Sequence, residues 1–250
     1  MSRILRALFG KNPAHPPIPR CSLELVEWES LRLVIRTHSV DRENLEWMKD
    51  SIFWKTFLTR KVEEGDVVFD LGSHIGAFGL RAAHYRRCMV LAAEPDHDSA
   101  TLHKINAAMN QLDSTQDIAE VAVGGSDEEV SLYEATTTWA HTTTGVGSAA
   151  NVLTGRSRSV PCLSLRSCLA RSRTRKCSFM KLNVEGAEFG FLRSASLLDL
   201  QQVGAIVAEL HFDLAPGATE AEVVDKLRLA GFLTKIFPSG SSRAFLVSER

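Results

Sequence analysis

Residues 65–80, Gly65-Asp-Val-Val-Phe-Asp-Leu-Gly-Ser-His-Ile-Gly-Ala-Phe-Gly-Leu80, join an apolar run to a turn marked by glycines. The apolar run predicts a buried strand that ends near Asp70, and Gly72 and Gly76 predict a tight turn before a helix. Glycine lets the backbone approach a ligand closely, and the first turn of a helix offers N–H groups without partners. Taken alone, the glycines would also fit close packing of the helix on the strand.

A second acidic residue strengthens the functional interpretation. Glu94 lies eighteen residues after Gly76, at the end of the next apolar run. A carboxylate at the tip of the second strand is well placed to accept hydrogen bonds from both hydroxyls of a ribose. The sequence therefore predicts a nucleoside-containing ligand across the carboxyl ends of the strands.

The pattern that follows the motif predicts an α/β fold. Strands are expected at Val67–Leu71, Met89–Ala93, Ile118–Val123, Phe179–Val184 and Ala205–Phe212, and helices at Ala77–Tyr85, Asp98–Met109, Ala187–Leu197 and Glu220–Ala230. Such alternation is typical of a mostly parallel sheet with helices on both faces. The connection between Phe232–Phe237 and Ala244–Ser248 is too short for a parallel crossover, so these strands are expected to form an antiparallel C-terminal hairpin.

The N-terminal part has a different pattern. Leu23–Trp28 and Leu31–Ile35 predict a β-hairpin, and Asp41 is the expected cap of a helix that runs to about Arg60. The segment Thr136–Thr154 is the expected long loop. The predicted parts are a basic, proline-rich tether (1–21), a hairpin and helix that cover the substrate side (22–64), and the ligand-binding domain (65–250).

Composition narrows the class of protein. The 250 residues include 29 Lys and Arg against 30 Asp and Glu, a net charge of −1 that excludes a globally basic nucleic-acid binder. No apolar run is long enough for a membrane span, and the N-terminal apolar stretch is too short for a secretory signal, so a cytoplasmic protein is expected. The five scattered cysteines are expected to be reduced and buried.

The turn residues also indicate which nucleoside is bound. The spacing Gly72-x-x-x-Gly76-x-x-Gly79 lacks the middle glycine of the dinucleotide motif. A carboxylate at Asp70 would repel a pyrophosphate, whereas it suits the ammonium and sulfonium groups of S-adenosylmethionine. A nicotinamide-dependent oxidoreductase is therefore the weaker alternative.

Three ordered motifs resemble those of the FkbM-type S-adenosylmethionine-dependent methyltransferases. They are Asp70-x-Gly72-Ser-His-Ile-Gly76, Ala93-Glu94-Pro95-Asp96 and Lys181-Leu-Asn-Val-Glu-Gly-Ala-Glu188. The resemblance implies a Rossmann-like class I methyltransferase fold with seven strands and O-methylation of a small molecule or sugar. Two positions depart from the family pattern: Asn183 stands where Asp is usual, and His74 where Asn is common.

The site follows from the sheet and the resemblance together. The residues expected to bind the cofactor are Asp70, Gly72, Ser73, His74, Gly76, Glu94, Pro95, Ala122 and Asn183. The catalytic candidates are Asn183 as a polar contact, with Glu185 or His211 as the base that deprotonates the acceptor. For Glu185 an equally plain interpretation is a carboxylate that favours a helix N-terminus.

Several residues have a structural interpretation beside the functional one. Lys181 is expected to pair with an acid such as Glu209. Glu209, His211 and Asp213 alternate along one strand and could converge on a metal, although polar groups lining a pocket are preferred and no metal is predicted. His74, His84, His97 and His103 are expected on loops or helix surfaces. Trp28, Trp47 and Trp54 are expected to pack, and Trp139 is a candidate substrate contact.

One segment is strongly basic. Between Ala135 and Val184 there is no acidic residue, and the cations are Arg156, Arg158, Arg166, Arg171, Arg173, Arg175, Lys176 and Lys181. A solvated surface is preferred, and an anionic acceptor is the sharper hypothesis. Two alternatives stay open: an RNA methyltransferase that uses residues 156–176, although nucleic acid is not the expected partner, and a cofactor-binding homologue without activity.

Overall fold

The computed structural model describes residues 22–148 and 151–250, so the predicted tether at 1–21 lies outside the described residues. Its strands are β1 (Leu23–Trp28), β2 (Leu31–Arg36), β3 (Val67–Leu71), β4 (Met89–Ala93), β5 (Gln116–Ala119), β6 (Ala122–Val123), β7 (Glu129–Ala135), β8 (Leu153–Leu163), β9 (Phe179–Leu182), β10 (Ala205–His211), β11 (Leu233–Pro238) and β12 (Arg243–Glu249). Its helices are α2 (Asp41–Asp50), α3 (Ile52–Thr59), α4 (Ala77–Arg86), α5 (His97–Met109), α6 (Leu165–Arg171), α7 (Glu188–Ser194), α8 (Leu197–Leu200) and α9 (Glu220–Leu229), with a 3₁₀ turn at Asp113–Thr115.

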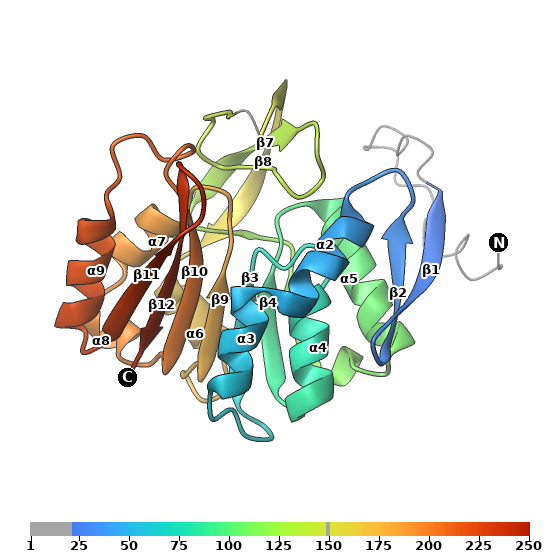
Figure 1. The fold of residues 1–250 in the computed structure, drawn as a ribbon, viewed down its shortest axis with the longest axis horizontal. Coiled ribbons are helices and arrows are strands. Elements are labelled where there is room, and N and C mark those ends of the chain that lie inside the picture. Colours follow the sequence, from blue (N-terminus) through green and yellow to red (C-terminus); the bar gives the residue numbers. More distant parts are fainter. Residues whose placement is uncertain (1–21, 149–150) are drawn as a thin grey trace.

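A seven-stranded sheet forms the centre of the fold, in the order β11-β12-β10-β9-β3-β4-β5 (Figure 1). The pairs β10–β9, β9–β3, β3–β4 and β4–β5 are parallel, and β12 is antiparallel to both β10 and β11. The predicted mostly parallel, Rossmann-like sheet with an antiparallel C-terminal hairpin is confirmed. Since the parallel strands end at one edge, their C-terminal residues converge there.

Helices cover both faces of this sheet because successive strand residues point to opposite sides. Val68 belongs to one buried cluster with α3, α4 and α5, whereas the next residue, Phe69, belongs to a second cluster with α6, α7 and α9. The four described cysteines are free and buried, as expected. No helix among the described residues is long and apolar enough to cross a membrane.

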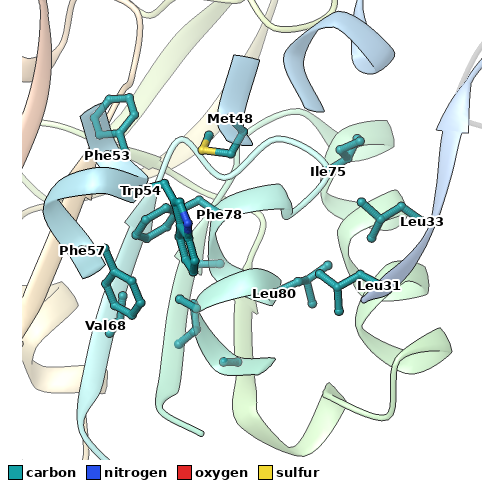
Figure 2. Close-up of a cluster of buried hydrophobic side chains, with 14 of the residues drawn as sticks. Leu31, Leu33, Met48, Phe53, Trp54, Phe57, Val68, Ile75, Phe78 and Leu80 are labelled. Carbon is teal, nitrogen blue, oxygen red and sulfur yellow. The ribbon is translucent and has the colours of Figure 1, made fainter. Parts of the chain in front are cut away.

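The N-terminal segment packs into the core of the sheet. The predicted hairpin is confirmed as β1–β2, with Leu31 and Leu33 in the first cluster (Figure 2). In α3, the ring of Phe57 lies 5.3 Å from that of Phe179 in β9 and 5.7 Å from that of Phe78 in α4. Residues 22–64 therefore share one hydrophobic core with the sheet.

The expected helix from about Arg42 to Arg60, with Asp41 as its cap, is wrong in two respects. It is broken at Ser51, an extended residue whose hydroxyl accepts a hydrogen bond from the N–H of Trp54 and so starts α3. Asp41 is not the cap: Val40 holds that position, and Asp41 is the fully buried first residue of α2.

The segment between β5 and β9 also differs from the expectation. The predicted strand Ile118–Val123 is divided into β5, in the main sheet, and β6, which pairs with β8. β7 and β8 form an antiparallel hairpin that was not predicted, and the expected loop Thr136–Thr154 lies between these strands except for its last two residues, which begin β8. The expected helix Ala187–Leu197 is interrupted at Ala195 and continues as α8.

Candidate active site

A cavity of about 330 Å³ opens at the carboxyl ends of the parallel strands. Its floor is formed by the turn after β3 and by the ends of β4 and β9. The surrounding walls come from α2, β12 and the segment between β7 and β8. Among the predicted site residues, Gly72, Ser73, His74, Glu94, Pro95, Ala122, Asn183 and Glu185 line it.

The turn after β3 is shaped by left-handed backbone positions. Gly72 has φ +75°, and a Cβ at this residue would lie 1.8 Å from the carbonyl oxygen of Asn183. Gly76, at φ +92°, faces the ring of His103 instead, and its N–H donates to the carbonyl of Ser73. Gly72 is therefore required at the cavity floor, whereas Gly76 allows close packing against α5 and does not line the cavity.

His103 is not on a helix surface as predicted. Its side chain is fully buried in α5, and its Nδ1 lies 3.0 Å from the hydroxyl of Ser73. Burial lowers the pKa of His103 to about 4, so the ring is neutral near neutral pH. His103 thus supports the turn from below.

Asp70 and Lys181 form a buried ion pair beneath this turn. The Nζ of Lys181 lies 3.2 Å from Asp70 Oδ1 and donates hydrogen bonds to the carbonyls of Gly72 and, at 3.3 Å, Leu71. Asp70 Oδ2 accepts from the N–H of Gly79. The expected pairing of Lys181 with an acid is confirmed, but the acid is Asp70 and not Glu209. Asp70 does not line the cavity. The geometry therefore assigns this pair to holding the turn, and a direct cofactor contact by Asp70 stays a prediction.

Glu94 presents an oriented carboxylate on the cavity wall. Its Oε2 accepts the N–H of His74 at 2.8 Å, and its Oε1 accepts the N–H of Asp96 at 2.9 Å. Burial, with the nearby Asp96 carboxylate, raises the pKa of Glu94 to about 7. Each carboxylate oxygen has a second lone pair, so the group can accept further hydrogen bonds from a ligand.

His74 is fixed by Arg36 and Asp41, whose role here the sequence did not indicate. Its backbone is left-handed (φ 51°), and its Nε2 lies 2.6 Å from Arg36 Nη2. The guanidinium of Arg36 is itself held by Asp41, at 2.9 Å through Nε and 3.0 Å through Nη2, and lies 3.3 Å from the hydroxyl of Ser99. Burial, followed by the Arg36 charge, lowers the pKa of His74 to about 4. The ring is therefore neutral, accepts from Arg36 through Nε2, and keeps an N–H donor at Nδ1.

Asn183 and Glu185 follow β9 and line the same cavity. Asn183 Oδ1 is buried and has no hydrogen-bond partner among the described residues. Glu185 has a left-handed backbone (φ 53°), and its Oε2 accepts from Asn151 Nδ2 at 3.0 Å. Burial raises the pKa of Glu185 above the ordinary value, against the influence of His211.

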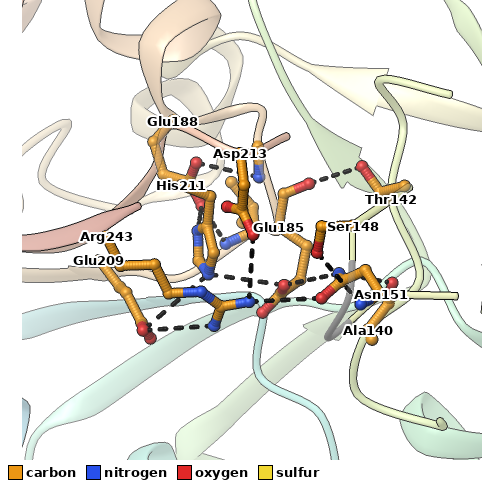
Figure 3. A network of polar contacts seen from close by, with 12 residues as sticks. Ala140, Thr142, Ser148, Asn151, Glu185, Glu188, Glu209, His211, Asp213 and Arg243 are labelled. Atoms are coloured by element: carbon orange, nitrogen blue, oxygen red, sulfur yellow. Dashed lines mark hydrogen bonds and ion pairs between the residues drawn. The ribbon is translucent and has the colours of Figure 1, made fainter. Parts of the chain in front are cut away.

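His211 lies behind Glu185 and does not line the cavity. Its ring is fully buried, and Nδ1 lies 3.0 Å from Glu188 Oε1 (Figure 3). Burial alone would lower its pKa, but the carboxylates of Glu188, Glu185 and Glu209 outweigh this and raise the pKa to about 9. His211 does not reach the cavity, and a protonated imidazole cannot accept a proton, so its position and its raised pKa both argue against His211 as the base.

The possible metal site along β10 is not formed. Among residues 22–148 and 151–250 there is no group of three or more His, Cys, Asp and Glu side chains arranged to hold a metal ion. Glu209 faces the cavity, and Asp213 Oδ2 lies 4.0 Å from Arg243 Nη2. These carboxylates border Arg243, a cavity residue that the sequence did not single out.

Four arginines of the basic segment are paired with acids from other parts of the fold. The pairs are Arg156–Glu134, Arg158–Asp96, Arg166–Asp199 and Arg171–Asp117, at 2.7–3.2 Å. Although residues 136–183 contain no acidic residue, the charges of these four arginines are neutralised by acids from other segments. Arg158 also donates to the carbonyl of Pro95, which lines the cavity.

The strand order, together with a cavity at the carboxyl ends of the strands, defines a Rossmann-like methyltransferase fold. Residues 70–234 match the model of the methyltransferase FkbM domain, so the chain belongs to this family. The family assignment that the three motifs suggested is thus confirmed.

The other comparisons concern individual proteins. No curated protein matches the chain. Similar solved structures include the METTL16 methyltransferase domain, at 15% identity over 78% of this chain and 63% of that one, with a TM-score of 0.46. Precorrin-6y C5,15-methyltransferase from Geobacter metallireducens is 9% identical over 80% and 87% (TM-score 0.46). An RNA methyltransferase from Salinibacter ruber, in complex with S-adenosyl-L-homocysteine, is 13% identical over 79% and 90% (TM-score 0.41). The chain spans less than two thirds of the METTL16 domain.

Membership of this family implies S-adenosylmethionine as the cofactor, and the cavity residues fit it. The Glu94 carboxylate suits ribose hydroxyls, and the unpartnered Oδ1 of Asn183 suits an ammonium donor. Gly72 leaves the floor free of a side chain, while Ala122 offers an apolar contact. The cavity volume also lies in the range of small-molecule sites.

Proposed function

We propose that this protein transfers the methyl group of S-adenosylmethionine to a hydroxyl oxygen of a small molecule or sugar, with Glu185 as the base. The observation behind this proposal is that the Glu185 carboxylate is buried, raised in pKa and part of the cavity lining. Glu94 shares these properties, but both of its oxygens already accept backbone N–H groups, which suits it to binding rather than to proton transfer. A hydroxyl is a poor nucleophile, and a positioned base contributes about 10²–10⁴-fold to such a reaction.

The alternative role for Glu185, a carboxylate that stabilises the N-terminus of a helix, is already taken by the neighbouring Glu188. Glu188 Oε1 accepts the N–H of Val184, and its Oε2 accepts the N–H of Gly186. The role of a carboxylate that satisfies backbone N–H groups near the start of α7 is therefore filled by Glu188. Glu185 instead points towards the cavity, and Asn151 holds its orientation.

The other cavity residues bind and align. Bound S-adenosylmethionine supplies an electrophilic methyl group on its sulfonium. Glu94 would hold the ribose, and the backbone near Gly72 and Ser73, with Asn183, would hold the methionine end. Since an in-line displacement depends on alignment and exclusion of water, the enclosing walls contribute to the rate by fixing the acceptor against Glu185.

The wall composition supports a compact acceptor. Trp47 and Phe245 stack with ring centroids 6.5 Å apart, and both line the cavity together with Trp139. Aromatic faces of this kind suit the apolar face of a ring, while Glu209 and Arg243 can bond to its polar groups. An acceptor that carries an anionic group would use Arg243.

The first test is ligand binding by the full chain. S-adenosylmethionine and S-adenosylhomocysteine should raise the melting temperature, whereas NADH should not. The protein and S-adenosylmethionine are then incubated with a metabolite pool, and products heavier by one methylene are detected by mass spectrometry. Glu185→Gln should bind S-adenosylhomocysteine like the parent but lose about 10²–10⁴-fold in product formation.

The matched control is Glu220→Gln, an exposed acid at the start of α9, which should retain the parent rate. Full activity of Glu185→Gln would contradict the assignment of the base. Cofactor binding without any methylated product would favour an inactive homologue. If only RNA is methylated, and RNA binding weakens steeply with salt, the acceptor is RNA and not a small molecule.

A further inference from the structure

The imidazole of His211 lies between two carboxylates, of which one, Glu185, lines the cavity. Its Nδ1 lies 3.0 Å from Glu188 Oε1, and its Nε2 lies 3.5 Å from Glu185 Oε2 (Figure 3). All three side chains are buried. The ring therefore links the candidate base to a second carboxylate that does not reach the cavity.

Glu188 is anchored to the backbone that carries Glu185. Its two oxygens accept the N–H groups of Val184 and Gly186, which flank Glu185. Glu185 itself has a left-handed backbone at φ 53°. The loop, the anchored carboxylate and the imidazole thus form one closed arrangement around the base.

We infer that His211 is a positioning residue, whose protonated ring holds the carboxylate of Glu185 ionised and aimed at the cavity. This inference rests on the proposed role of Glu185 as the base. The ring would donate to Glu188 through Nδ1 and face Glu185 through Nε2–H, an atom that has no hydrogen-bond partner among the described residues. His211 would act through Glu185 and never contact the acceptor.

The surrounding carboxylates favour the protonated form of the ring. On β10 itself, Glu209 Oε1 lies 4.0 Å from His211 Nε2. From β12, Arg243 Nη1 lies 3.6 Å from the same Glu209 oxygen, and Arg243 Nη2 lies 3.3 Å from Asn151 Oδ1 and 4.0 Å from Asp213 Oδ2. His211 and Arg243 are the two cations of this cluster, and its carboxylates are Glu185, Glu188, Glu209 and Asp213.

Loss of the His211 charge should leave Glu185 protonated. Burial already raises the pKa of Glu185, and the nearby imidazolium opposes that rise. An opposite charge at this distance is worth about 1–3 pKa units. A neutral residue at position 211 would therefore allow burial and the remaining carboxylates to hold a proton on Glu185, which could then no longer act as a base.

The test is a titration that needs no acceptor. The full-length protein is labelled with ¹³C in the glutamate carboxyl groups, and the resonance of Glu185 is assigned by its loss in Glu185→Gln. In His211→Gln the midpoint of Glu185 should rise by about 1–3 pH units. His84→Gln, which removes an exposed histidine of α4, should leave it unchanged.

A second measurement does not depend on the folding of a His211 variant. With ¹⁵N-labelled histidine in the parent, one buried ring should stay protonated to about pH 9. A neutral His211 at neutral pH, or an unshifted Glu185 in His211→Gln, would overturn the inference. These titrations do not depend on turnover. An unshifted Glu185 midpoint in His211→Gln would contradict the positioning role of His211, whereas full activity of Glu185→Gln would contradict the proposed role of Glu185 as the base.

Discussion

Glu94 should make the stability of this protein fall as the pH rises from about 4.5 to about 7. Its pKa is raised from 4.5 to about 7 in the folded protein, chiefly by burial. Between these values the native state keeps a proton that the unfolded state has lost, so the free energy of unfolding decreases by about 1.4 kcal/mol per pH unit. The stabilisation is complete below about pH 4.5 and is lost above about pH 7.

The size of the effect follows from the shift. A rise of about 2.5 units corresponds to about 3 kcal/mol, and solvent screening reduces this little because Glu94 is only 8% exposed. Urea unfolding of the ligand-free protein at several pH values, compared with Glu94→Gln, isolates the contribution of this carboxyl. The parent should lose about 3 kcal/mol relative to the variant between about pH 4 and pH 8.

Cofactor binding should show the opposite pH dependence. If ribose hydroxyls donate to ionised Glu94, S-adenosylhomocysteine should bind up to tenfold more weakly for each pH unit below about 7. Calorimetric titrations at about pH 6 and pH 8, in buffers of equal ionic strength, measure this change. Parallel stability curves for parent and variant, together with pH-independent binding, would refute the role given to Glu94.

Three further substitutions test the floor of the cavity. Gly72→Ala should abolish binding of S-adenosylhomocysteine, because its Cβ would lie 1.8 Å from the Asn183 carbonyl oxygen. The control Gly190→Ala on α7, whose added Cβ would meet no atom within 4 Å, should bind normally. Equal binding by both variants would contradict this. Lys181→Met should lower the free energy of unfolding in urea by about 3–5 kcal/mol, because it leaves Asp70 buried and unpaired. The double variant with Asp70→Asn should recover part of this loss, whereas additive losses would mean that the two residues are not coupled. Asn183→Asp should strengthen binding of S-adenosylmethionine roughly tenfold relative to S-adenosylhomocysteine, which keeps the ammonium group but lacks the sulfonium charge that the new carboxylate would attract. An equal change for both ligands in calorimetry would exclude this effect.

The sequence predicted the central strands well because their signals are local. β3, β4, β9 and β10 are short apolar runs that end at polar or glycine residues, and their predicted bounds agree with the structure to within two residues. A fully buried parallel strand is hydrophobic on both faces, which makes such a run easy to find. The turn at Gly72 and the acid at Glu94 were found for the same reason.

Elements whose pattern is mixed were harder to predict. Residues 154–159 of β8 are Thr, Gly, Arg and Ser and are mostly exposed, so this part of the strand resembles a loop in sequence. Ser51 interrupts an otherwise amphipathic run because its hydroxyl caps α3, and a single capping residue inside an apolar pattern gives a weak signal.

The partners of the site residues could not be predicted from spacing. Arg36 reaches His74 across 38 positions, and Lys181 reaches Asp70 across more than a hundred. Such pairs depend on strand order and register, which place distant residues side by side. The two histidines differ for the same reason: His103 faces a glycine turn and is neutral, whereas His211 faces carboxylates and is charged.

The edge-to-face packing of Phe57 against Phe78 and Phe179 limits how acceptor specificity can be exchanged between relatives. The α2 wall of the cavity and the α3 rings that enter the core belong to one continuous run of chain. A graft that imports a new α2 with its flanking helix must also match these aromatic contacts, and a graft that stops at Ser51 must preserve the cap. The same segment thus affects both acceptor choice and folding. Acceptor specificity is therefore more readily changed by substituting single cavity residues of α2 than by replacing α2 and α3 together.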